Sequence, residues 1–315
     1  ALDKGVGYQP SPDAGAEVAV ETNNYAADTG NVGGAVIASV LKSGSNMFKG
    51  NAFEFYRNSD LDANRWENNR SGAAEPKRGQ DIFGATFGGP LMRDKLFFFG
   101  DYQGSRQDAP GATTASVAPA AWRNGDLSSV NVVIRDPLTG LPFPNNQIPA
   151  SRISPVARAI LGDTANYPLP NAPVAGVTGN YVGQTLTEVR AHQGDIRLDW
   201  NASQNDKIFG RLSMKSFRSD TTLAAFPLIM GSFDDQPFWN VGFNWNRLFG
   251  AAIVNEALVG YISTSRANGV ADWAGIGSAN AKYGIAGGQP IGGMSSIGWG
   301  SGLTAPRNIA SNSDT

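Results

Sequence analysis

The sequence contains no cysteine, a single histidine and nearly balanced charge. Without a thiol, the chain can form neither a disulfide nor a thiolate metal site, and it has no cysteine nucleophile. One imidazole, His192, is a poor basis for a metal site. A net charge of −2 gives no reason to expect nucleic acid as a partner. No serine elbow or paired-carboxylate arrangement stands out either, and we expect no enzyme activity, no cofactor and no bound metal.

Long apolar segments are missing as well. No run approaches the roughly 20 residues that a membrane-spanning helix needs. Residues 1–15 also lack the basic and apolar regions of a signal peptide. The sequence is instead rich in glycine, with 39, and has 10% aromatic residues against 17% charged residues. This composition is typical of a β-barrel, so a membrane role would have to be carried by strands.

Residues 80–104 form the clearest expected β-hairpin. Phe83 and Phe87 fall on one face of its first run, and Phe98 and Tyr102 alternate with Phe99, Asp101 and Gln103 in its second run. A polar turn at 93–95 joins the two runs. Aromatic side chains on one face suit a strand that lies between lipid and water. A soluble two-sheet sandwich could use the same pattern.

Alternation recurs at 50–57, 189–200, 207–217, 239–246 and 254–263. In the last segment the face is ambiguous, because Glu256 shares its side with Leu258 and Ile262. Elsewhere we expect the apolar set to point outward: Phe83, Phe87, Phe98, Tyr102, Ile196, Leu198, Trp200, Leu212, Val241, Phe243 and Trp245. We expect the polar set to point to the concave side: Asp101, Asp195, Arg197, Asp199, Arg211 and Asn244.

The connections between these segments alternate in length. Short turns fall near 91–95, 201–206 and 249–252, and long connections fall at 58–79, 105–188 and 218–237. Outer-membrane barrels have short periplasmic turns and long extracellular loops, whereas most soluble sandwiches do not sort loop length by strand end. The fold class that we predict is all-β, an antiparallel up-and-down transmembrane barrel to which this chain contributes about seven strands.

Charged side chains on the expected inner wall are the candidates for a functional role. They would line the lumen and the path of a solute, although interior ion pairs explain them equally well: Glu54, Asp101, Asp195, Arg197, Asp199 and Arg211. His192 is expected to face the lumen or the rim. Asp60 and Asp62 resemble the start of a calcium loop, but Arg65 stands where glycine is needed, so we expect a polar loop there.

Three segments carry a family resemblance. They are ETNNYAADTGNVGGAVIASVLKSGSNMFKGNAFEFYRNSDLDANRW, GATFGGPLMRDKLFFFGDYQGSRQ and IRDPLTGLPFPNNQIPASRISPVARAIL. These segments resemble TonB-dependent outer-membrane transporters of the Oar-like group of acidobacterial type. The resemblance implies that residues 1–46 end a plug domain and that residues 47–315 begin the barrel, with a long extracellular loop at about 105–188. Such barrels have about 22 strands, so the chain is expected to be a fragment.

The same resemblance implies a function and a location. We expect uptake of a large or scarce solute, such as a siderophore, glycan or peptide, across the outer membrane of a Gram-negative bacterium. Energy would come from the TonB–ExbB–ExbD complex through an N-terminal region outside this chain, and outer-membrane lipid would surround the wall. Residues 34–41, apolar on both faces, would pack inside the curve of the sheet. The alternatives are a passive porin, a surface adhesion protein, or a soluble glycan-binding β-sandwich.

Overall fold

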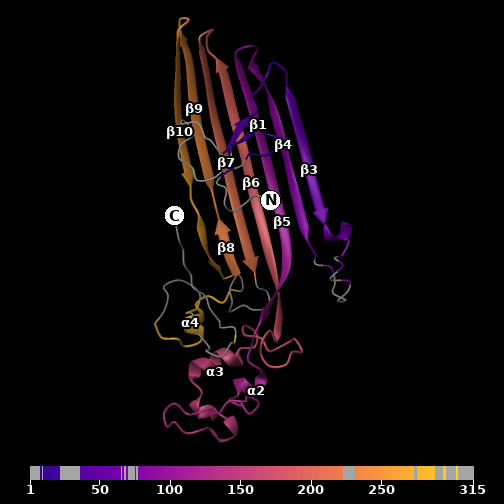
Figure 1. Cartoon of the computed structure of the whole chain (residues 1–315), viewed down its shortest axis with the longest axis vertical. Helices are drawn as coiled ribbons and strands as arrows, with labels where there is room; N and C mark the ends of the chain where they lie inside the picture. The colour runs from indigo at the N-terminus through magenta and orange to yellow at the C-terminus, as the bar shows by residue number, and fades with distance from the viewer. Residues whose placement is uncertain are drawn as a thin grey trace.

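One antiparallel sheet dominates the computed structural model, which describes residues 8, 10–21, 36–64, 66, 69, 75, 77–222, 231–272, 275–287, 294–295 and 303. Its strands are neighbours in the order β10–β9–β7–β6–β5–β4–β3 (Figure 1). They are β3 (Lys49–Asn58), β4 (Gly79–Met92), β5 (Leu96–Ala115), β6 (Tyr181–Asn201), β7 (Asp206–Thr222), β9 (Phe238–Phe249) and β10 (Ile253–Thr264). This up-and-down order confirms the predicted fold class, and the barrel is not closed.

The three short turns lie together at one rim of the sheet, at the top of Figure 1. Asp94 adopts a positive φ of 61° in the first turn, and its backbone N–H donates to Asn46 Oδ1 at 2.8 Å. Gly250 takes φ 66° in the last turn. The predicted alternation of turn length is therefore present, with the long connections at the opposite end.

Two strands extend further than their sequence pattern indicated. β5 has 20 residues and β6 has 21, whereas a membrane-spanning strand needs about 9–11. They stay paired from Leu96↔Trp200 to Ala115↔Tyr181. The connection expected at 105–188 is therefore shorter, because residues 105–115 and 181–188 continue the sheet. Their side chains do not alternate between apolar and polar, so periodicity could not detect them.

Two short strands were also missed. β8 (Gly231–Asp235) pairs with the end of β7, and β11 (Ala267–Ala271) pairs with β8. The first lies within residues 218–237, which were expected to be a loop, and the second lies in the expected tail. Each has five residues and carries little apolar patterning, so their pairing depends on the neighbouring edge rather than on their own sequence.

Register assigns every wall residue to one of two faces, because directly paired residues in an antiparallel sheet share a face. Pairs such as Ile196↔Leu212 and Leu212↔Val241 place all eleven predicted outward residues on one face, called here the outer face. Pairs such as Asp101↔Asp195 and Arg197↔Arg211 place the predicted inward set on the other, called the inner face. Both predictions are confirmed.

An apolar band crosses the outer face. On β6 it runs from Trp200 through Leu198 and Ile196, which are 44–51% exposed, to His192. That distance is about 26 Å along the strand, close to the apolar height of an outer-membrane barrel. The imidazole Nδ1 of His192 lies 2.7 Å from the Tyr102 hydroxyl. His192 thus lies on the outer face at the edge of the band, within the strand, rather than in the lumen or at the rim as expected.

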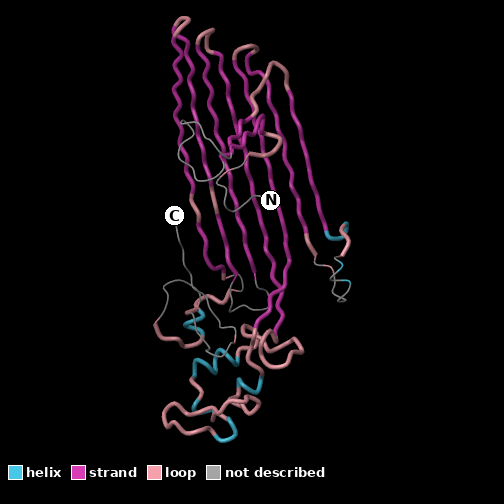
Figure 2. Tube along the Cα trace, in the orientation of Figure 1, coloured by secondary structure: helices cyan, strands magenta, loops and turns pink. Residues whose placement is uncertain are grey.

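A small two-stranded ribbon lies against the large sheet (Figure 2). It consists of β1 (Gly15–Glu21) and β2 (Val36–Leu41), paired antiparallel. Ala14 and Leu41 form a small apolar cluster with Phe99 of β5. Residues 34 and 35 lie outside the described residues. Leu41 is buried against Phe99 but Val40 is 48% exposed, so the described part of β2 packs on the sheet with one face, and the burial on both faces suggested by its apolar pattern is not observed.

The long connection between β5 and β6 folds into a unit with its own core. This unit, called here the cap, comprises residues 116–180 and the packed segments 275–287 and 294–295. It contains the helices α2 (Ala120–Arg123), α3 (Pro155–Gly162) and α4 (Ala279–Lys282) and the 3-10 turns Pro144–Asn146 and Ala150–Arg152; another such turn, Ser59–Leu61, follows β3. Ser154 caps α3 by accepting from Ala157 N at 3.1 Å. No helix among the described residues is long and apolar enough to cross a membrane.

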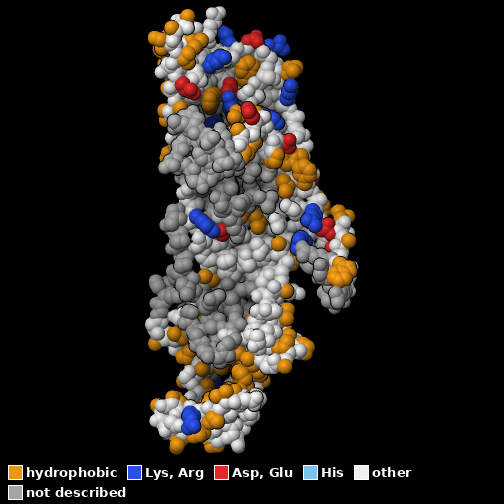
Figure 3. All heavy atoms as spheres, in the orientation of Figure 1, with side chains coloured by type: hydrophobic (Ala, Val, Ile, Leu, Met, Phe, Trp, Pro, Cys, Tyr) orange, Lys and Arg blue, Asp and Glu red, His pale blue; other side chains and the backbone are white. Residues whose placement is uncertain are grey.

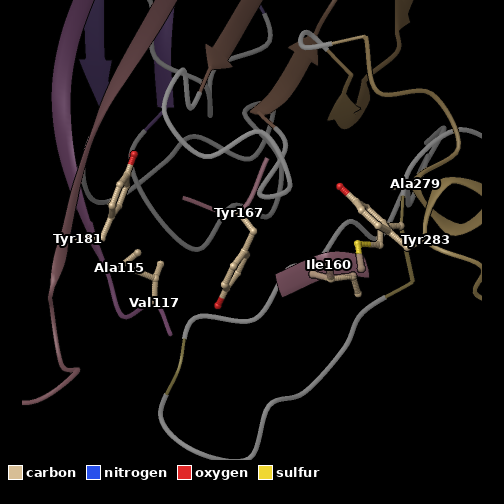
Figure 4. Packing of buried hydrophobic residues seen from close by; sticks show 8 residues of the cluster. Ala115, Val117, Ile160, Tyr167, Tyr181, Ala279 and Tyr283 are labelled. Atoms are coloured by element: carbon tan, nitrogen blue, oxygen red, sulfur yellow. The ribbon is translucent and has the colours of Figure 1, made fainter. Parts of the chain in front are cut away.

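Aromatic and aliphatic side chains fill the core of the cap. Figure 4 shows Tyr167, Ile160, Val117 and Tyr283 converging there, and Tyr167 is fully buried. Arg123 lies beside Tyr167 and donates to the carbonyl oxygens of Ala118 at 2.8 Å, Leu161 at 2.9 Å and Tyr167 at 2.7 Å, and also to that of Pro168. One guanidinium thus satisfies backbone acceptors from two ends of the loop.

Candidate functional site

Two aspartates face each other on the inner face. Asp101 in β5 and Asp195 in β6 are register partners, and they are only 9% and 1% exposed. Like charges directly opposite in a strand pair destabilise the sheet unless donors compensate them. Ser213 of β7 supplies one donor, through its hydroxyl, to Asp195 Oδ1. Asp101 Oδ1 has no hydrogen-bond partner among the described residues.

The other donors come from the N-terminal segment, residues 8–14, rather than from the wall. Ser11 donates its hydroxyl to Asp101 Oδ2 at 3.1 Å, and Tyr8 donates its hydroxyl to Asp195 Oδ2. The Tyr8 ring also stacks on Phe238 of β9, with centroids 5.1 Å apart. Two neutral hydroxyl groups, those of Tyr8 and Ser11, therefore bind this segment to the Asp101–Asp195 pair. Hydrogen bonds to charged acceptors are stronger than neutral ones but exchange readily with water.

Arg197 forms a second contact between the wall and the ribbon. It makes a bidentate ion pair with Asp199, with N–O distances of 2.8 and 2.9 Å, and donates from Nη1 to the Leu41 carbonyl at 3.0 Å. Its guanidinium carbon lies 4.7 Å from the ring centroid of Phe209. Asp199 and the Phe209 ring fix the orientation of the Arg197 guanidinium. Its Nη1 is therefore already positioned to donate to the Leu41 carbonyl.

Arg211 is the register partner of Arg197 and lines a cavity of about 480 Å³ between β2 and the strands β7, β9 and β10. Among the described residues it makes no ion pair. Glu256, whose side was ambiguous from the sequence, also lines this cavity and accepts from Asn244 Nδ2 at 2.8 Å. Figure 3 shows charged side chains of both signs gathered near the short-turn rim.

A second cavity, also of about 480 Å³, lies on the inner face toward the long loops. It is called here the amide pocket. Pro10, Pro12 and Asp13 of the N-terminal segment form one side of it. The wall side combines three aromatic rings and several amides: Phe53, Phe55, Phe217, Gln80, Gln103, Gln107 and Gln193.

The structure brings together five of the six predicted site residues. Asp101, Asp195, Arg197, Asp199 and Arg211 all lie on the inner face. Glu54 does not, because its register partner is Phe83 of the outer face. The residues of β3 that face inward are Phe53 and Phe55, whose ring centroids are 5.7 Å apart. Aromatic residues occupy both faces of β3, so the assumption that its charged residue points inward was wrong.

Sequence reasoning missed the donors and the amides. Tyr8 and Ser11 belong to a segment without periodicity, and their partners are 187 and 90 residues away. No local pattern reports a contact over such a separation. The glutamines could have been found, because Gln103 and Gln193 occupy inward positions of strands that were assigned correctly.

Comparison with known proteins identifies the class. Residues 40–315 match the family described as outer membrane beta barrel domain, and the chain belongs to that family. It therefore lies in the cell outer membrane. The chain is also 33% identical over 218 residues to the TonB-dependent transporter Oar of Myxococcus xanthus. This alignment covers 61% of the present chain.

The match covers only 20% of the Oar transporter, so the chain spans about a fifth of that relative's length. Among solved structures, the outer membrane transporter YddB from Escherichia coli aligns with a TM-score of 0.49 and 14% identity. That alignment covers 84% of this chain and 27% of the YddB chain.

Proposed function

We propose that the chain is the plug end and first barrel strands of a TonB-dependent outer-membrane transporter. In this proposal residues 1–46 belong to the plug and residues 47–315 to the barrel. The observation that carries the proposal is that the N-terminal segment is hydrogen-bonded to the wall. The Tyr8 hydroxyl donates to Asp195 and the Ser11 hydroxyl to Asp101. The likeness to the Oar transporter supports the same assignment.

The contacts between the N-terminal segment and the wall suit a segment that dissociates from the wall and rebinds during transport. They are mostly polar, and the apolar cluster that joins the two contains three residues, Ala14, Leu41 and Phe99. A hydrogen bond to a charged group contributes about 1.5–3 kcal/mol, and water replaces it when the segment moves. Small apolar cores and solvated hydrogen bonds are features of regions that open locally. A passive porin has no need for such a releasable seat.

The energy source and the solute follow from the same proposal. The TonB–ExbB–ExbD complex would pull on the plug through the region that precedes this chain, and the segment 8–14 would leave the carboxylate pair. The inner-wall charges Arg197 and Arg211 would then face the solute path. The solute would be a siderophore, a glycan or a peptide, bound first at the surface and admitted when the plug moves.

A reversible cross-link tests this function. In the full-length protein, the pair Ser11→Cys and Asp101→Cys would tie the segment to the wall, and the present chain has no cysteine that would compete. We expect the oxidised protein to bind solute at the cell surface but to lose TonB-dependent uptake. Reduction should restore uptake, because only the tether blocks movement of the segment.

The matched control is Thr114→Cys with Val182→Cys, which joins β5 to β6 at register partners within the wall. This tether leaves the segment free, so uptake should continue. Undiminished uptake with the Ser11–Asp101 tether verified by mass spectrometry would remove the gating role. Equal uptake in cells with and without TonB would favour the passive porin.

A further inference from the structure

The amide pocket is the inner-face cavity with the clearest chemical character. We propose that it is a substrate subsite for a neutral oligosaccharide, an inference that rests on the proposed transport function and names its solute class. The cavity measures about 480 Å³, within the range of about 300–1,000 Å³ that is usual for small-molecule sites. Its lining residues Gln80, Gln107 and Val189 lie on the long-loop side of Asp101 and Asp195.

The pocket contains a buried polar atom that none of the described residues satisfies. Gln193 is 3% exposed, and its Oε1 has no hydrogen-bond partner among the described residues. Buried polar atoms are almost always satisfied in folded proteins, by protein groups, water or a ligand. Because Gln193 lines the pocket, a ligand with a hydroxyl group at this position would complete its hydrogen bonding.

The side chains favour a neutral ligand rich in hydroxyl groups. Each glutamine amide offers both a donor and an acceptor, and a sugar hydroxyl also offers both. The rings of Phe53, Phe55 and Phe217 supply apolar surfaces for the C–H face of a pyranose. Asp13 is the charged residue in the described lining, and its carboxylate disfavours an anionic ligand. A ferric siderophore with negative charge therefore fits poorly.

The location also disfavours an extended peptide. Peptides commonly bind to sheets by adding a strand to an exposed edge, where backbone groups are unpaired. The pocket lies on the inner face of β3 to β7, and of these strands only β3 has an outer edge that is free for strand addition in the described sheet, away from the centre of the pocket at Gln103 and Gln193. Recognition here depends on side chains, as is usual for sugars.

The position of the pocket couples binding to the plug contact. Pro10, Pro12 and Asp13 line the pocket, and Tyr8 and Ser11 of the same segment hydrogen-bond to the aspartate pair. Along β6, Gln193 of the pocket precedes Asp195 by one inward position. A sugar in the pocket therefore touches the segment that must move.

Binding to the full-length transporter in detergent tests the proposal. The probes are maltohexaose, cellohexaose and xylohexaose, with the anionic siderophore ferric enterobactin and a neutral hexapeptide for comparison, each measured by titration calorimetry. We expect at least one oligosaccharide to bind more tightly than both comparison probes. Gln193→Leu should weaken its binding about tenfold, because one ligand hydroxyl loses its partner. Phe53→Ala should weaken binding to a similar extent without changing a polar group.

The matched control is Gln184→Leu, which removes an amide from the same strand at an exposed position on the opposite face. Heat-modifiable gel mobility checks that each variant has folded. Unchanged affinity in folded Gln193→Leu and Phe53→Ala overturns the subsite, and so does a failure of all three oligosaccharides to bind. If ferric enterobactin or the peptide is then taken up in a TonB-dependent way, the proposed transport function is retained and only the sugar subsite is rejected. Oligosaccharide binding that is lost in both variants, with uptake independent of TonB, supports the subsite but overturns the proposed TonB-dependent function.

Discussion

The membrane-spanning part of the sheet and the cap bury opposite kinds of side chain. In the sheet, Ile196 is 51% exposed on the outer face while its neighbour Asp195 is 1% exposed on the inner face. In the cap, Tyr167 and Ile160 are buried at the centre. The two regions are continuous in the chain, since β5 and β6 lead directly into the cap.

This difference in burial shows that the sheet is adapted to lipid and the cap to water. An apolar side chain gains little from leaving lipid, so the outer face can display it, and the polar groups must be satisfied on the inner face. In water the apolar groups drive folding, so the cap encloses them. The boundary lies near Tyr102 and His192, beyond which Arg106 and Arg190 appear on the outer face. Substitutions that exchange the two environments test this division.

The largest effect is expected in the core of the cap. Tyr167→Ala removes a fully buried ring, and truncation of a buried aromatic side chain costs about 3–5 kcal/mol. We expect the cap to become sensitive to added protease on intact cells while the barrel keeps its heat-modifiable mobility. The matched variant Phe243→Ala, on the outer face, should leave the cap resistant. Equal sensitivity in both variants would contradict the separation of the two regions.

A somewhat smaller effect is expected within the apolar band. Ile196→Arg places a charge in contact with lipid near the middle of the band, where the cost is about 2–4 kcal/mol. The control Gln103→Arg adds the same charge on the inner face and should cost less than about 1 kcal/mol. Denaturant unfolding of the full-length protein in lipid vesicles measures both. A similar loss for the two variants would mean that the outer face does not meet lipid.

The smallest effect concerns acid sensitivity of the cap. Partial burial acts to raise the pKa of Asp163, but hydrogen bonds from Lys282, Asn166 and Tyr283 outweigh it and hold the pKa below its ordinary value. A depressed pKa gives stability that is present above the ordinary value of about 3.9 and lost below it. Protease resistance of the cap should thus stay constant from pH 8 to pH 5 and fall below about pH 4.

Asp163→Asn is the control for this pH dependence. It removes the titrating group, so resistance should be lower at neutral pH and should lack the acidic transition attributed to Asp163. A transition near pH 6 in the unaltered protein would show that another group controls the contact between the two cap segments.

Alternation made the membrane-spanning sheet predictable. Because lipid selects for apolar side chains on one face, residues such as Trp200 and Val241 could be assigned from spacing alone. The same rule fails beyond the apolar band, on the side of the cap, because neither face of β5 and β6 meets lipid there. It also fails at β3, where Phe53 lies on the inner face and Glu54 does not.

The candidate site was predictable only in part. Asp195 and Arg197 follow from the period of their strand. The donors Tyr8 and Ser11 do not, because a segment without periodicity gives no indication of the distant strand that it contacts. The contact of Asp163 with Tyr283 spans 120 residues and is equally invisible to local patterns. What the sequence cannot supply is the pairing of segments by long-range hydrogen bonds.

The unbroken length of β5 and β6 has a mechanical consequence. The two strands form one hairpin arm that starts at the short-turn rim, passes the carboxylate pair and ends at Ala115 and Tyr181, which are themselves part of the cap core. The cap is therefore joined to the sheet by two paired strands whose ends pack into its core, and not by a flexible linker. We expect a displacement of the cap to be transmitted through these paired strands to Gln193 and Asp195.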